Sequence, residues 1–281
     1  MKNSPIRIYQ VDAFTSEPFR GNPASVCILN EPRDDRWMQS VAMEMNLSET
    51  AFLVPRSPNR FDIRWMTPTV EVDLCGHATL ASAHILFEEG FVDPHKPISF
   101  YSRSGPLSAS LVEGVSPAPA WAPAMRSIEM NFPAKFEHEI IEPPGELLLS
   151  VPSEIVYIGK NDFDYLLELR DEATVRSVVP NFTLMKKVGA RGIVITSRAD
   201  KDKDYDFVSR GFYPGSGIDE DPVTGSAHCM LGPYWMPRLR KSNLMGFQAS
   251  ARGGYVRVQT DGDRVRLYGN AVTILKGELT A

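Results

Sequence analysis

The stretch CGHATLASAHILFEEG, residues 75 to 90, is where the fold of this 281-residue chain first becomes readable. The residues that recur at the spacing of one helix face are Leu80, Ala81, His84, Ile85 and Phe87. Gly90 follows as a residue that commonly ends helices. The pattern predicts a buried central helix that starts near Gly76.

A second stretch repeats this plan. GSGIDEDPVTG, residues 215 to 225, leads into SAHCMLGPYW, where a helix start is followed by a predicted break or bend at Gly232-Pro233. Both parts of the chain show a strand, a proline, an acidic loop, a glycine and a helix in that order. The spacing matches only loosely, so the shared order is the better indication of two similar halves.

Strands and one further helix surround these two stretches. The predicted strands are IRIYQVDAF (6–14), ASVCIL (24–29), FDIRWMTP (61–68), GARGIVITS (189–197), YDFVSRGFYP (205–214), GYVRVQ (254–259), DRVRLYG (263–269) and NAVTILKGEL (270–279). DDRWMQSVAMEM, residues 34 to 45, has the apolar spacing of an amphipathic helix. VSPAPAWAPAMRS, residues 115 to 127, carries three prolines and predicts a connector between two pieces of domain size.

Composition limits the class of protein. With 43% hydrophobic and 23% charged residues, the chain is typical of a globular protein rather than a disordered one. A formal net charge of -5 creates no field that would attract nucleic acid or anionic lipid, so we expect neither as a partner. Three cysteines without paired spacing indicate neither a disulfide framework nor a structural zinc site. The first residues lack the apolar core of a signal peptide, and we expect a cytoplasmic protein.

The two predicted helix starts can each bind an anion. Unpaired N–H groups and a partial positive charge occur at the N-terminus of a helix, and small residues let a ligand approach them. Cys75-Gly76-His77-Ala78-Thr79 and Thr224-Gly225-Ser226-Ala227 both have this composition, and Ser226 adds a hydroxyl. The alternative is that each is only a tight turn into a helix. Two such segments, each after acidic residues, favour a site.

Carboxylates precede both helices. Asp219, Glu220 and Asp221 include the best-placed candidate, Asp221, five residues before Ser226; the other two acids are typical caps or solvated loop residues. Glu49 lies where a loop enters an apolar strand. Partial withdrawal from water at such an edge would suit it to carry a proton, whereas an exposed turn would give it no role.

Several classes of site are not supported. His77 and His84 could share a helix face, but no further ligands at metal spacing accompany them, so we predict no metal. No GxSxG elbow, dinucleotide fingerprint or GxxxxGK[ST] occurs, which disfavours a serine hydrolase and NAD or ATP sites. Cys27 and Cys229 are interpreted as core residues, whereas Cys75 at a helix start stays open to reactivity.

Four motifs in one order resemble the PhzF-like (phenazine biosynthesis) isomerases of the diaminopimelate epimerase-like superfamily. They are VDAFTSEPFRGNPASV (11–26), MNLSETAFL (45–53), VDLCGHATLASAH (72–84) and GIDEDPVTGSAHC (217–229), and the resemblance covers about residues 5 to 275. It implies an α+β fold of two similar halves. Each half is a curved, mostly antiparallel sheet around a central helix, and the active site lies between the halves.

The resemblance also implies domain limits and partners. We expect an N-terminal half over residues 1–118, a C-terminal half over 128–270, and a terminal strand at 271–281 that can cross to the first half. It further implies a homodimer that needs no cofactor.

Site roles follow by motif position. Glu49 would transfer the proton, and His77, Asp221 and Ser226 would hold and polarise the substrate. The expected substrate-binding residues are Gly76, Ala78, Thr224 and Gly225. The superfamily's racemases place a cysteine in each half, but here Thr224 and its neighbours offer no thiol, which disfavours two-cysteine racemisation.

We therefore expect a 1,3-type proton shift on a small carboxylated, cyclic substrate, with Glu49 as the only acid/base. In phenazine-producing members of the family the substrate is a dihydro-hydroxyanthranilate. Two alternatives remain at this point. One is an amino-acid epimerase that uses Cys75 with Glu49 or Asp221. The other is a non-catalytic binding protein of the same fold.

Overall fold

A computed structural model describes residues 5–113 and 126–280 of the chain. The chain divides into two compact units, the first formed by residues 1–132 and 266–281 and the second by residues 133–265. The sequence placed the limits at 118 and 128 instead. Most of the predicted proline-rich connector lies outside the described residues, and the strand after it pairs within the first unit, which moves the limit to residue 132.

The first unit contains nine strands and two helices among its described residues. They are β1 (Ile6–Ala13), β2 (Asn22–Ile28), α1 (Asp35–Met45), β3 (Glu49–Ser57), β4 (Arg60–Met66), β5 (Glu71–Val72), α2 (Gly76–Glu88), β6 (Ile98–Ser102), β7 (Gly105–Val112), β8 (Ser127–Pro133) and β18 (Ala271–Leu279). A further strand, β17 (Arg264–Gly269), runs across the second limit between the units.

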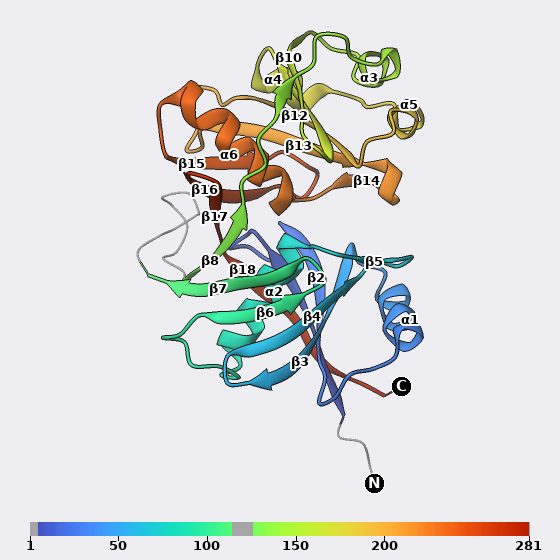
Figure 1. Ribbon diagram of the computed structural model, residues 1–281, viewed down its shortest axis with the longest axis vertical. Helices are drawn as coiled ribbons and strands as arrows, with labels where there is room; N and C mark the ends of the chain where they lie inside the picture. Colours follow the sequence, from blue (N-terminus) through green and yellow to red (C-terminus); the bar gives the residue numbers. More distant parts are fainter. Residues whose placement is uncertain (1–4, 114–125, 281) are drawn as a thin grey trace. The chain divides into compact units, whose positions relative to one another are not determined.

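Helix α2 is the predicted central helix. It packs against β1, β2, β3, β7 and β18, and Figure 1 shows the strands of this unit around it, with α1 on the outside. Leu80, Ala81 and Ile85 are fully buried. Burial extends beyond the predicted stripe, because small side chains such as Ala78 and Ala83 let strands approach the helix from several sides.

Helix α1 covers the other face of β3. The Asp34 carboxylate accepts a hydrogen bond from the Trp37 N–H at 2.8 Å and caps the helix, as its position before the apolar pattern predicts. Phe52 belongs to the apolar cluster under α1. Because side chains alternate along a strand, Glu49 at the start of β3 points to the α2 face.

Strand pairing in the first unit gives the order β18-β1-β2-β3-β4-β6-β7-β8, with β5 beside β4. The pairs β2–β3 and β4–β6 are parallel, and the others in this order are antiparallel. The C-terminal strand β18 pairs along the whole of β1, from Ile6 opposite Leu279 to Ala13 opposite Ala271. The sheet is therefore mixed, with antiparallel pairs in the majority.

The second unit has its own set of elements. They are β9 (His138–Glu139), α3 (Gly145–Ser150), β10 (Ile155–Lys160), β11 (Asp164–Leu169), α4 (Glu172–Ser177), α5 (Phe182–Lys187), β12 (Gly192–Arg198), β13 (Phe207–Tyr213), the 3-10 turn η1 (Pro214–Ser216), β14 (Ile218–Asp221), α6 (Gly225–Leu239), β15 (Asn243–Gln248) and β16 (Gly254–Asp261).

The pairing plan of the first unit recurs in the second. The order is β9-β10-β11-β12-β13-β15-β16, with β14 beside β13, and the pairs β11–β12 and β13–β15 are parallel. Thus β11, β12, β13 and β15 correspond to β2, β3, β4 and β6. The matching order and direction of the strand pairs support an internal duplication more strongly than the residue spacing in the sequence does.

Helix α6 corresponds to α2 and differs from its prediction in length. It runs through Pro233 and ends at Leu239 instead of breaking at Gly232-Pro233. It packs against β15 and β16, and a Cβ at Gly232 would lie 2.5 Å from a Val258 methyl. This close, buried packing outweighs the hydrogen bond that a proline removes from a helix.

No helix in the described ranges is long and apolar enough to cross a membrane.

Candidate active site

The sequence-predicted site residues form two clusters, one in each unit, and each cluster is described by itself. In the first unit, Glu49 begins β3 opposite Ala24 of β2, and His77 lies in the first turn of α2. Both residues are buried, with side chains 11% exposed for Glu49 and 5% exposed for His77. The exposed-turn alternative for Glu49 is therefore wrong.

The His77 ring has a polar neighbour at each nitrogen. Nε2 lies 3.1 Å from Oε2 of Glu49, and Nδ1 lies 3.1 Å from the side-chain nitrogen of Asn22. The Cys75 sulfur is 3.5 Å from Nδ1. The Asn22 amide nitrogen is a donor, so Nδ1 accepts in that contact, and the proton of the neutral ring lies on Nε2, the nitrogen nearest Glu49.

Neighbouring groups in this cluster favour protonation of His77. Burial lowers the pKa of His77, but interactions with Cys75 and Glu49 outweigh burial and raise the pKa well above the ordinary 6.5. Burial and the nearby Glu49 raise the pKa of the Cys75 thiol to about 11. The thiol is therefore protonated near neutral pH.

The same three side chains carry donor types that bind zinc. One carboxylate oxygen of Glu49, the sulfur of Cys75 and a ring nitrogen of His77 all lie within 4.8 Å of one another. These residues could hold a metal ion. The prediction that none is required stays a prediction.

In the second unit, Asp221 ends β14 and is held by its surroundings. The Thr224 hydroxyl donates to its Oδ2 at 2.5 Å, and the Gln248 amide donates to its carbonyl at 2.7 Å. The Thr224 N–H donates to Gln248 at 2.9 Å. The polar groups of Thr224 therefore bond to Asp221 and Gln248, and its role in substrate binding stays a prediction.

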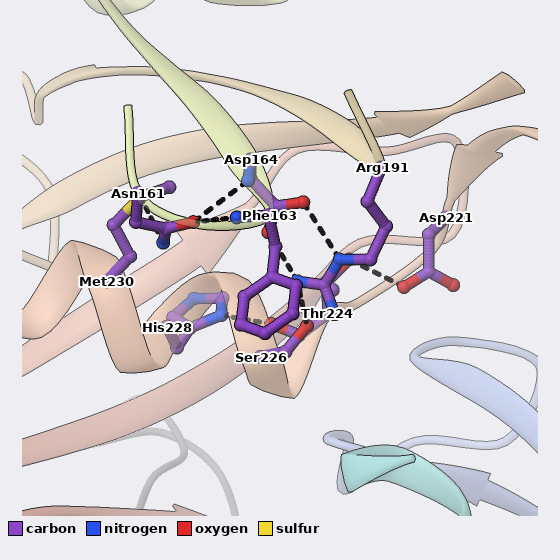
Figure 2. Close-up of polar contacts among 9 residues, drawn as sticks. All are labelled: Asn161, Phe163, Asp164, Arg191, Asp221, Thr224, Ser226, His228 and Met230. Carbon is purple, nitrogen blue, oxygen red and sulfur yellow. Dashed lines mark hydrogen bonds and ion pairs between the residues drawn. The ribbon is translucent and has the colours of Figure 1, made fainter. Parts of the chain in front are cut away.

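Ser226 lies in the first turn of α6, beside an arginine (Figure 2). Arg191 Nη2 is 3.4 Å from the Ser226 hydroxyl, and its guanidinium is hydrogen-bonded to Asp164 through both Nε and Nη2. Neither α2 nor α6 has a side-chain cap at its start, so the backbone amides near Gly76 and Gly225 have no capping side chain as acceptor.

The remaining polar residues near α6 are structural. Glu220 forms a two-point ion pair with Arg210, and Asp219 is exposed, in agreement with a cap or solvated role. His228 is fully buried and its Nδ1 lies 2.8 Å from the Thr224 carbonyl. Burial lowers the pKa of His228 to about 4, so it stays neutral.

Sequence reasoning missed Asn22, Asp164 and Arg191 as members of these clusters. Asn22 is the first residue of β2 and belongs to the quoted motif VDAFTSEPFRGNPASV. Arg191 is a lone cation immediately before the buried run of β12, and a charged residue at such an edge is the available signal. Asp164 gives no local signal, because only the parallel pairing of β11 with β12 brings it to Arg191.

Comparisons with known proteins agree with the resemblance noted from the motifs. A family model described as phenazine biosynthesis-like protein matches residues 11–277. An uncharacterized isomerase of Halalkalibacterium halodurans is 48% identical over 272 residues, which cover 97% of each chain.

Solved structures show the same fold. The crystal structure of a PhzF-family phenazine biosynthesis protein from Enterococcus faecalis superposes with a TM-score of 0.89 at 36% identity, covering 99% of this chain and 100% of that one. A probable proline racemase from Agrobacterium radiobacter gives a TM-score of 0.66 at 11% identity, covering 98% and 93% of the two chains. The second match shows the fold alone and confirms the predicted epimerase-like α+β class.

Proposed function

The chain belongs to the phenazine biosynthesis-like (PhzC/PhzF) family of isomerases, and from this premise we propose that it moves a proton between two carbons of a small carboxylated, cyclic substrate without a cofactor. Glu49 is the acid/base. The observation that carries the proposal is the buried Glu49 side chain with His77 Nε2 3.1 Å from its Oε2.

The reaction needs only one proton carrier. Glu49 takes the proton from a C–H next to an unsaturated system, so that an O–H bond forms as the C–H bond breaks and the electron pair enters the conjugated system. The carboxyl proton exchanges with solvent, and the same carboxyl group then delivers a proton to another carbon on the same face. The double bond moves, and nothing is oxidised or reduced.

His77 has an electrostatic part in this scheme. His77 Nε2 lies 3.1 Å from the carboxylate, where its N–H can stabilise negative charge that develops on the substrate during the transfer. Asn22 holds the ring in place. General acid–base catalysis contributes about 10²- to 10⁴-fold, so binding and orientation supply the remainder.

Substrate binding is proposed for the helix starts and the second cluster. In the first unit, the backbone amides at Gly76 and Ala78 suit an anionic group. In the second unit, the Gly225 amide with the Ser226 hydroxyl suits a carboxylate, and Asp221 suits an amine or hydroxyl group. Thr224 holds Asp221 in position.

The epimerase alternative is less well supported. Inversion of a stereocentre needs a base on one face and an acid on the other, and a thiol with a pKa of about 11 is a poor base near neutral pH. At the position that corresponds to Cys75 the second unit has Thr224, whose hydroxyl is already donated to Asp221.

A screen in deuterated water tests the proposal. Small cyclic enes with a carboxylate, together with amino acids, are incubated with the protein and read by mass. We expect one deuterium in a product whose double bond has moved. Exchange only at the α-carbon of amino acids, with inversion, would instead support the epimerase, and no exchange in any compound would support a non-catalytic protein.

A further inference from the structure

A guanidinium in the second unit is fixed along one edge beside Ser226. Asp164, only 1% exposed, accepts hydrogen bonds from Nε and Nη2 of Arg191, whereas the Arg191 side chain is 37% exposed. An arginine carries five N–H donors in a rigid fork, and this pairing uses its Nε side. The opposite edge of the Arg191 guanidinium keeps N–H groups that can donate to a ligand.

The local backbone holds both partners in place. The Asn161 side chain accepts from the N–H groups of Phe163 and Asp164 at 2.8 and 2.9 Å, and the Arg191 N–H donates to the Phe163 carbonyl at 2.9 Å. Figure 2 shows Arg191 between the turn that carries Asp164 and the start of α6 with Ser226. The guanidinium is thus held by residues that do not belong to α6.

Neighbouring side chains restrict the guanidinium further. Its central carbon lies 5.1 Å from the ring centre of Phe163 and 5.9 Å from that of Tyr213. Gly192 permits this packing, because a Cβ there would lie 2.2 Å from the Tyr213 ring and 3.0 Å from the Asp164 carboxylate. An arginine held by a buried acid, two rings and a glycine loses little side-chain freedom when it binds a ligand.

Exposure alone does not distinguish Arg191 from a structural ion pair. Arg176 and Glu172 form a comparable pair in the same unit, with side chains 43% and 2% exposed, but there the Tyr205 hydroxyl lies 2.9 Å from Arg176 Nη2. At Arg191 the corresponding contact is to Ser226, a residue proposed to bind substrate, at the longer distance of 3.4 Å. At this distance one ligand oxygen can accept hydrogen bonds from both Arg191 and Ser226.

We propose that Arg191, positioned by Asp164, binds the carboxylate of the ligand together with the Ser226 hydroxyl and selects carboxylates over neutral analogues. Asp164 balances the charge of the guanidinium, so the selectivity comes from directed N–H and O–H donors rather than from net charge. The inference rests on the proposed function only in taking this ligand to be the substrate.

Calorimetric titration tests the inference with two matched probes, 2-aminobenzoate and 2-aminobenzamide, which differ in charge but little in shape. We expect the wild-type protein to bind the carboxylate about tenfold or more tightly than the amide. Arg191→Gln should reduce this preference to less than about twofold by weakening only the carboxylate. Arg191→Lys, which keeps the charge without the fork, should recover part of the preference.

Arg176→Gln is the matched control and should keep the wild-type preference, because its ion pair resembles that of Arg191 but lies against Tyr205. Circular dichroism verifies that each variant folds, and Arg191→Lys carries the test if Arg191→Gln does not. A wild-type protein without preference for the carboxylate, no binding of either probe at millimolar concentration, or an unchanged preference in both folded Arg191 variants would overturn the inference.

Glu49→Gln separates this inference from the proposed function. Its probe preference should equal that of the wild type, since Glu49 is not required for anion selection. An Arg191-dependent preference without deuterium exchange in any compound would leave the inference standing and reject the proposed reaction. Deuterium exchange together with a carboxylate preference that does not depend on Arg191 would support the proposed reaction and reject the inference.

Discussion

Cys75 and Thr224 hold the same position in the two units, the residue immediately before the central helix, and only Cys75 carries a thiol. Neither side chain caps its helix. Cys75 Sγ lies near the His77 ring, and the Thr224 hydroxyl is donated to Asp221. The duplicated fold therefore lacks the pair of thiols that a two-cysteine racemase needs.

Replacement of Cys75 by serine should reduce turnover by less than about tenfold, against the 10²- to 10⁴-fold expected for a lost acid or base. The thiol has a pKa of about 11 and is buried, so it carries little thiolate at neutral pH. The measurement is the initial rate of deuterium incorporation in wild type and Cys75→Ser.

Thiol titration provides an independent check. Burial raises the pKa values of Cys27 and Cys229 as well, the latter to about 12. The folded protein should react slowly with a disulfide reagent at pH 8, and three thiols should react after unfolding in urea. Rapid modification of one thiol in the folded state, with parallel loss of activity, would favour the epimerase.

The His77 imidazolium should stabilise the fold in a pH-dependent way. Its folded pKa is raised, so its contribution is complete below about pH 6.5 and is lost as pH rises through the higher folded value. The free energy of unfolding of wild type should thus exceed that of His77→Gln most at pH 6, and the difference should shrink in alkaline solution. Urea unfolding from pH 6 to pH 10 measures this.

His84 is a control with the opposite sign. Burial lowers its pKa in the folded state, so the folded protein binds fewer protons there than the unfolded chain. Wild type should lose stability relative to His84→Gln as pH falls below 6.5. An identical trend for both histidines would show that the pH dependence does not come from the Glu49–His77 pair.

Leu80→Ala tests the central helix. The Leu80 side chain is fully buried on α2 and approaches the backbone at Gly269, so its truncation leaves a cavity. The free energy of unfolding should fall by about 2–5 kcal/mol. Leu149→Ala, at a side chain 68% exposed on α3, should change it by about 0.5 kcal/mol or less. Equal effects would mean that α2 is not the core.

Metal removal should leave the reaction unchanged. Glu49, Cys75 and His77 bring three zinc-type donors together, so the prediction of a metal-free enzyme needs a direct check. Dialysis against EDTA should not lower the rate of deuterium incorporation, and added zinc should not raise it. Loss of activity with EDTA and recovery with zinc would assign these residues to a metal site instead.

Much of the fold could be predicted from local pattern. The helix at 35–45 was readable from Asp34 and the apolar spacing, and the strands with alternating or β-branched residues, such as β12 and β13, were also predicted. The part between residues 134 and 188 was not, because its helices span only six residues each and carry too few turns to show a period. The continuation of α6 through Pro233 depends on tertiary packing, which cannot be predicted from the local sequence.

Contacts in the candidate site could be predicted where both residues belong to the same sequence motif. Asp221 and Thr224 lie three residues apart and contact each other directly. The pair Asp164–Arg191 could not be predicted, since it joins residues 27 positions apart through the pairing of two parallel strands. Glu49 and His77 were both candidates, but their contact depends on β3 facing α2.

The account depends most on Glu49 as the proton carrier. With a substrate from the deuterium screen, Glu49→Gln should lower the rate of label incorporation by at least about 10²-fold and leave the unfolding midpoint within a few degrees of wild type. Glu44→Gln, an exposed residue of α1, is the control and should keep the wild-type rate. Deuterium incorporation at an unchanged rate in folded Glu49→Gln protein would contradict the account.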